Sequence, residues 1–184
     1  MQRAMTRLGL FLAAAVCLTH PAMAQREKPL PAQEVVDAAV KKARASKKST
    51  LVLFHASWCG WCRRLDAALN DPDVRKIIGD SYVVVHLDVM EHDDKKALEN
   101  PGGNTLMADY GGENSGLPFY VFLDAKGKKI ADSNAMPKDQ NIGYPAAPEE
   151  IEAFEKLLKQ TAPRLTDAQR GKIVAYLKKN APRQ

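Results

Sequence analysis

The chain has 184 residues, of which 45% are hydrophobic, and carries a formal net charge of +5 at pH 7. This length is enough for one domain with a sizeable core, and no internal repeat or low-complexity tract divides it. The positive charge is too small, and too poorly interleaved with aromatic residues, to indicate nucleic-acid binding. Three cysteines in the whole chain also exclude a scaffold held together by several disulfides.

Residues 1–24 have the three parts of a secretory signal peptide: a basic start, an apolar core and small residues before the cleavage site. We expect cleavage after Ala24, with the mature protein periplasmic or otherwise exported. The apolar core, residues 8–18, is about half the length of a spanning helix, so no stable membrane insertion is expected. Cys17 lies within it and is interpreted as an apolar filler, because the residues before it match the lipid-attachment pattern poorly.

Removal of this leader leaves Cys59 and Cys62 as the only cysteines and lowers the net charge to +3, because the leader contains two arginines and no acidic residue. Residues 25–33 hold two prolines and are interpreted as a linker. We predict a single domain over residues 34–180. A C-x-x-C loop is too short to stabilise the fold much by constraining the unfolded chain, so its purpose is expected to be chemical.

Hydrophobic periodicity predicts an amphipathic helix over residues 34–46, a buried strand over 51–55 and a helix that follows the dithiol and runs to Asn70. Within this last helix Cys62 shares a face with two leucines, so its side chain is expected to point inward. Cys59 lies at the first turn and is expected to point outward.

The later elements are predicted from apolar runs, turn residues and caps. Ala125-Lys126-Gly127 indicates a hairpin, and Thr166 begins a capping box for the last helix. In chain order these elements are a helical turn at 74–78, a strand at 82–89, a short helix at 105–110, strands at 119–124 and 128–133, and helices beginning at 148 and 166. The order predicts an α/β fold with a central mixed sheet and helices on both faces, plus an N-terminal helix and an extra C-terminal helix.

Cys59-Gly60-Trp61-Cys62 is the strongest functional signal, because a C-x-x-C dithiol after a strand and before a helix is typical of redox sites. A helix N-terminus favours the thiolate, which is the nucleophile in disulfide exchange. We therefore predict that Cys59 attacks a partner disulfide and that Cys62 resolves the mixed disulfide. Arg63, one turn further on, either adds to this effect or is simply solvated.

Metal binding is the main alternative chemistry for these residues. A zinc site would need two further Cys or His ligands, and the sequence has no second C-x-x-C and no H-x-x-x-H. A second group of candidate ligands is interpreted as a strand end running into a charged loop: His86, Asp88, His92, Asp93 and Asp94. No metal and no cofactor are expected.

Residues 49–160 resemble the thioredoxin family. The resemblance rests on Trp58-Cys59-Gly60-Trp61-Cys62 after the first central strand, on Gly116-Leu117-Pro118 before the hairpin, and on Ile142-Gly143 before the next helix. It implies a thioredoxin-like fold, a cis peptide bond at Pro118 and backbone groups of Leu117 presented to an extended substrate. The residues predicted to contact substrate are Trp58, Gly60, Trp61, Leu117 and Pro118.

Three departures from the family pattern affect the chemistry. Leu53 occupies the position where thioredoxins usually have a buried aspartate that assists proton transfer, which leaves a water, His55 or Asp88 for that role. Gly60-Trp61 replaces the usual Gly-Pro dipeptide, so the redox potential of thioredoxin cannot be transferred. The segment from Asp88 to Gly116 is longer than in thioredoxin and is a candidate specificity loop.

The functional prediction is an exported thiol:disulfide oxidoreductase that acts on protein disulfides, with reduction favoured over oxidation. The first helix, strand and dithiol look similar to the periplasmic electron-relay domain of thiol:disulfide interchange proteins, and this resemblance implies a membrane electron donor. Two alternatives stay open: a metal- or client-binding chaperone on a thioredoxin scaffold, and a dedicated reductant in cytochrome c maturation. No nucleic-acid partner is expected.

Overall fold

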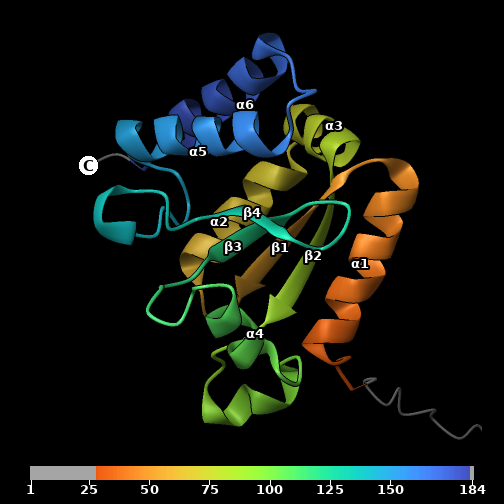
Figure 1. Ribbon diagram of the computed structural model, residues 1–184. Helices are drawn as coiled ribbons and strands as arrows, with labels where there is room; N and C mark the ends of the chain where they lie inside the picture. Colours follow the sequence, from red (N-terminus) through yellow and green to blue (C-terminus); the bar gives the residue numbers. More distant parts are fainter. Residues whose placement is uncertain (1–27, 183–184) are drawn as a thin grey trace, which may run out of the picture.

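The computed structural model describes residues 28–182, so the predicted leader lies outside the described part of the chain. Its centre is one four-stranded sheet (Figure 1) with the order β2-β1-β3-β4. β1 pairs in parallel with β2 and antiparallel with β3, and β3 pairs antiparallel with β4. This confirms the predicted mixed sheet and hairpin, with strands β1 (Ser49–His55), β2 (Tyr82–Asp88), β3 (Phe119–Leu123) and β4 (Lys129–Asp132).

Helices cover both faces of this sheet, as predicted. One face carries α1 (Ala32–Ser46) and α4 (Gly103–Asp109), and the other carries a larger group in which α6 packs beside α5 and α3 (Figure 1). That group consists of α2 (Gly60–Asn70), α3 (Pro72–Ser81), α5 (Pro148–Thr161) and α6 (Asp167–Asn180). Short 3₁₀ helices lie at Asp93–Leu98 and Pro137–Asp139.

Alternating side chains of β1 divide the core into two layers. Leu51 and Leu53 belong to the cluster beneath α2, α3, α5 and α6, whereas Val52 and Phe54 belong to the cluster beneath α1 and α4. All four are nearly inaccessible to solvent. Because both faces of β1 are buried, its sequence is a continuous apolar run, and its C-terminal end delivers the chain directly to the dithiol.

Two helix boundaries differ from the prediction. α1 begins at Ala32, inside the segment interpreted as a linker, because the N–H of Ala32 donates to the Pro101 carbonyl at 2.9 Å. This bond joins segments far apart in the sequence, so local patterning does not reveal it. α3 is longer than the predicted turn because the Asp71 carboxylate caps it by accepting from the N–H of Asp73 and of Val74.

The predicted capping box at the last helix is confirmed. Thr166 Oγ1 accepts from the N–H of Gln169, and the Gln169 side chain accepts in return from the N–H of Thr166. Among residues 28–182, no helix is both long and apolar enough to cross a membrane.

Gly112 is fixed by close packing where the chain approaches β3. A Cβ atom at this position would lie 2.7 Å from the Phe119 ring and 2.8 Å from Met107 Cγ, whereas a Cβ at Gly171 in α6 would meet nothing within 4 Å. The two glycines therefore provide a matched pair of substitution sites, one crowded and one open.

We predict that Gly112→Ala lowers the free energy of unfolding by about 1–3 kcal/mol through overpacking. Gly171→Ala should raise it by about 0.5–1 kcal/mol because alanine favours a helix interior. Urea unfolding of both variants checks this pair, and equal effects would contradict the packing that we describe.

Candidate active site

Cys59 and Cys62 form a disulfide at the start of α2, with a Cα–Cα distance of 5.3 Å. Cys59 is the N-cap residue of the helix, and its Sγ accepts a hydrogen bond from the N–H of Cys62 at 3.1 Å. The predicted placement of the first sulfur at a helix N-terminus is therefore confirmed. The same N–H would stabilise a thiolate on Cys59 after reduction, because the first N–H groups of a helix lack partners within it.

The expected outward orientation of Cys59 is wrong. Cys59 and Cys62 are each only 2% exposed, and both pack against Ala56 and the half-buried Leu117. As the N-cap residue, Cys59 turns its sulfur back toward the helix, and the disulfide holds it there. The inward orientation of Cys62 is confirmed.

The Leu117–Pro118 peptide bond is cis, as the family resemblance implies. It immediately precedes β3, and Leu117 contacts the cysteine cluster. Asn141 supports this segment, because its Nδ2 donates to the carbonyls of Gly116 at 2.7 Å and Pro118 at 3.0 Å. Asn141 was not identified from the sequence, where an isolated asparagine in a polar loop carries no signal.

The two tryptophans beside the dithiol are exposed large apolar side chains, Trp58 by 43% and Trp61 by 48%. Trp61 stacks on Tyr144 with a centroid distance of 6.0 Å, and the Arg64 guanidinium lies 5.5 Å from its ring. A groove of about 390 Å³ runs from Trp61 past Leu117 to Tyr144. An exposed aromatic platform next to an open groove is suited to bind an extended apolar segment.

Trp58 is held in place by the loop between β2 and α4, which forms the first part of the candidate specificity loop from Asp88 to Gly116. Its Nε1 donates to the Met90 carbonyl at 2.8 Å, and its ring lies 5.5 Å from that of His92. The loop therefore contacts the residue that immediately precedes Cys59, which places the additional segment at the redox site.

Glu91 from the same loop is 3% exposed, and the sequence did not point to it. Its carboxylate accepts from the N–H of Ser57 at 2.5 Å and from the Ser57 hydroxyl at 2.8 Å. Charge-assisted hydrogen bonds of this kind are stronger than neutral ones. Glu91 is therefore a positioning residue for the Ser57-Trp58 turn, two residues before Cys59. From the sequence, a lone glutamate in a charged loop is expected to be solvent-exposed, so only the tertiary structure reveals its buried contacts.

Leu53 is 2% exposed in the core, so the position of the usual family aspartate is fully apolar. Two residues further along β1, His55 Nε2 lies 3.4 Å from Asp88 Oδ1. Burial lowers the pKa of His55, and the charge of Asp88 opposes this effect. Burial likewise raises the pKa of Asp88, and His55 opposes it. Two of the three candidates for proton transfer thus form one pair at the end of β1.

The candidate metal ligands do not converge. His86 Nε2 lies 2.8 Å from Asp66 Oδ1 on α2, and His92 lies beside Trp58. Within residues 28–182, no group of three or more His, Cys, Asp or Glu side chains is arranged to hold a metal ion. Arg63 donates to the Ser57 carbonyl at 3.1 Å, so it supports the turn before the dithiol.

A family model described as thioredoxin-like matches residues 32–125, which is half of the chain. The protein belongs to the thioredoxin-like family, and it carries a Cys59–Cys62 disulfide at the position of that family's redox pair.

Three solved structures illustrate the similarity of the fold. A disulphide isomerase from Xylella fastidiosa Temecula1 shares 21% identity, with coverage of 87% of this chain and 98% of that one, at a TM-score of 0.49. A DsbH oxidoreductase shares 20% identity over 84% and 96% of the two chains, at a TM-score of 0.43. The oxidised DsbD C-terminal domain of Neisseria meningitidis shares 21% identity over 56% and 84%, at a TM-score of 0.42.

We predict that Glu91→Gln lowers the free energy of unfolding by about 1–3 kcal/mol, because the amide cannot accept both Ser57 hydrogen bonds as a carboxylate does. It should also accelerate alkylation of Cys59 in the reduced protein, because a loosened Ser57-Trp58 turn would expose the sulfur of Cys59, a residue that is 2% exposed in the disulfide form. Urea unfolding and timed iodoacetamide labelling check the two effects. Glu113→Gln, at an exposed position, is the control, and parent-like behaviour of Glu91→Gln in both assays would refute the assigned role.

We also predict that the protein becomes less stable as the pH falls from about 7.5 to about 5.5. Because the pKa of His55 is lowered in the folded state, the unfolded chain binds more protons in this range. The raised pKa of Asp88 acts in the opposite sense, but at lower pH, nearer the ordinary carboxylate range. His55→Gln should flatten the pH dependence of the free energy of unfolding, measured by urea unfolding across this pH range. An unaltered slope in His55→Gln would count against this account.

Proposed function

We propose that this protein is an exported thiol:disulfide oxidoreductase that exchanges disulfides with proteins, and that it acts as a reductant. The observation that carries the proposal is the Cys59–Cys62 disulfide at the N-terminus of α2, next to the cis Leu117–Pro118 bond and between two exposed tryptophans. Export follows from the predicted leader and its cleavage after Ala24.

The proposed reaction begins with the reduced protein. The Cys59 thiolate attacks one sulfur of a substrate disulfide, a mixed disulfide forms, and the other substrate sulfur leaves as a thiolate. The Cys62 thiolate then attacks Cys59 Sγ, which forms the Cys59–Cys62 disulfide and releases the second substrate thiolate. Two electrons pass from the protein to the substrate, and two protons from the thiols balance the two thiolates released.

Substrate binding is assigned to the surface beside the dithiol. Trp58 and Trp61 flank it, and the groove from Trp61 to Tyr144 passes the Leu117 backbone. Gly60 adds no side chain between the tryptophans. Pro118 follows, through a cis peptide bond, the Leu117 that packs against the cysteine cluster. An extended segment around a substrate cystine fits this open, partly apolar groove better than a small molecule would.

The reductant direction is inferred from the resemblance of the first helix, strand and dithiol to the periplasmic electron-relay domain of thiol:disulfide interchange proteins. The turn before Cys59 carries charges of both signs, because Ser57 contacts the Glu91 carboxylate, the Arg63 guanidinium and the Lys95 ammonium group. A reductant in an oxidising compartment needs its dithiol regenerated, so we propose a membrane protein as electron donor.

We predict that Cys59→Ser abolishes catalysed reduction of insulin, with a loss of at least about a hundredfold, because the thiol that attacks the substrate disulfide is absent. Cys62→Ser should also lose turnover but accumulate a mixed disulfide with a substrate peptide, since the resolving thiol is absent. Turbidity measures turnover, and mass spectrometry identifies the cysteine that is linked.

Trp61→Phe is the matched control, because it keeps both sulfurs and an aromatic ring. Its expected effect is a raised KM with little change in kcat. Retained turnover in Cys59→Ser, or a mixed disulfide that resolves in Cys62→Ser, would exclude the proposed roles of the two cysteines.

A further inference from the structure

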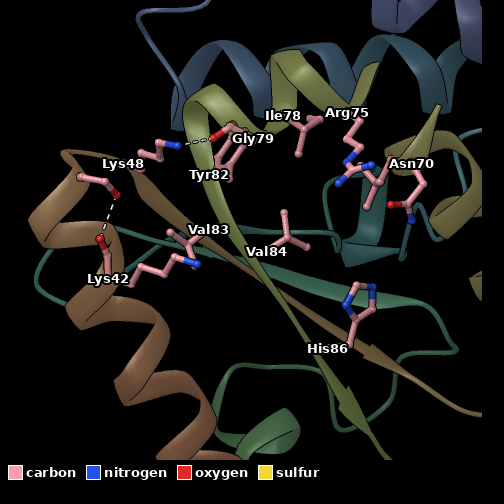
Figure 2. A pocket seen from close by; sticks show the side chains of 12 residues that line it. Lys42, Lys48, Asn70, Arg75, Ile78, Gly79, Tyr82, Val83, Val84 and His86 are labelled. Atoms are coloured by element: carbon pink, nitrogen blue, oxygen red, sulfur yellow. Dashed lines mark hydrogen bonds between the residues drawn. The ribbon is translucent and has the colours of Figure 1, made fainter. Parts of the chain in front are cut away.

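The sheet has an open edge at β2, away from the redox site. A groove of about 490 Å³ lies along this edge. Figure 2 shows β2 in this groove between α1 and α3. Its floor includes Val83, Val84 and His86 of β2, and its sides include Lys42 of α1 and Arg75 of α3. Among the strands of residues 28–182, which have the order β2-β1-β3-β4, β2 has no neighbour on this side.

The backbone of β2 offers unpaired groups to this groove. The N–H of Val89 donates to the His55 carbonyl at 2.9 Å, whereas the N–H of Asp88 points the other way and donates to Asn100 Oδ1 at 2.8 Å. Because successive residues of a strand direct their backbone groups to opposite sides, Val84 and His86 direct theirs away from β1. No hydrogen bond from residues 28–182 covers these groups. Asn100 pairs with the backbone of Asp88, so the unpaired part of β2 ends before that residue.

The charge of the groove is positive. Lys42, Lys48 and Arg75 line it, and its lining in the described chain contains no Asp or Glu. Lys48 donates to the Gly79 carbonyl, while Lys42 and Arg75 form no ion pair with any residue in the range 28–182. Asp66 contacts the lining residue His86, and Asp80, which follows the lining residue Gly79, is paired with Lys76.

We propose that this edge is a docking site for an extended, acidic segment of a partner protein, which adds to the sheet as a fifth strand beside β2. Backbone hydrogen bonds to Val84 and His86 would supply affinity, and Lys42 and Arg75 would select acidic side chains. A second copy of this chain fits poorly, because pairing two β2 edges would bring the same lysines and arginine together. The proposal does not depend on the dithiol.

The probe is a hexapeptide of alternating Glu and Val with blocked ends, compared with the same peptide carrying Lys in place of Glu. We expect the acidic peptide to bind the purified protein and to slow hydrogen exchange at the Val84 and His86 amides. Lys42→Glu combined with Arg75→Glu should weaken binding by about tenfold at low salt, given the modest worth of each exposed charge. Lys172→Glu, on the exposed face of α6, is the matched control and should bind like the parent.

Three outcomes would overturn the proposal. Equal binding of the two peptides would exclude selection by charge. A second outcome combines two results: inorganic phosphate shifts the NMR signals of Lys42 and Arg75, and the acidic peptide leaves the Val84 and His86 amides unprotected. This outcome would indicate an anion site without strand addition. Dimerisation of the parent that protects the same amides would assign the edge to a second copy. A Cys59→Ser variant that still binds the acidic peptide separates this site from the proposed redox function.

Discussion

One hydrogen bond links the fold of this protein to its chemistry: the N–H of Cys62 donates to Cys59 Sγ at the start of α2. It makes a reactive sulfur the cap of a helix, so the helix and the redox centre depend on the same atom. β1 is buried on both faces and ends a few residues earlier, which fixes where α2 can begin. The position of the dithiol is thus set by the core, and the two sulfurs occupy different environments along one helix.

The loop between β2 and α4 fixes the position of the residues that lead into the dithiol. Glu91 binds the turn at Ser57, and Met90 accepts from Trp58, so a segment some thirty residues further along the chain orients the residues just before Cys59. Because the Ser57-Trp58 turn is held rigidly, it limits how a substrate disulfide can align with the attacking sulfur of Cys59.

Much of this architecture could be predicted from local sequence. The apolar run of β1, the capping box at Thr166 and the turn at Ala125-Lys126-Gly127 each encode one element within a few residues, and the structure has them there. The features that escaped prediction depend on distant partners. The start of α1 relies on Pro101, the burial of Cys59 on Leu117, and the role of Glu91 on Ser57. No periodicity or motif marks such contacts, because they exist only once the sheet has brought the segments together.

The reduction potential of the Cys59–Cys62 pair tests the central claim most directly. Equilibration of the purified protein with glutathione buffers, followed by separation of the oxidised and reduced forms, measures it. The account predicts a reduction potential more negative than about −230 mV, which is more reducing than the glutaredoxins and closer to thioredoxin. A value near about −120 mV, typical of a strong protein oxidant, would contradict it, because such a dithiol would donate its disulfide instead of its electrons.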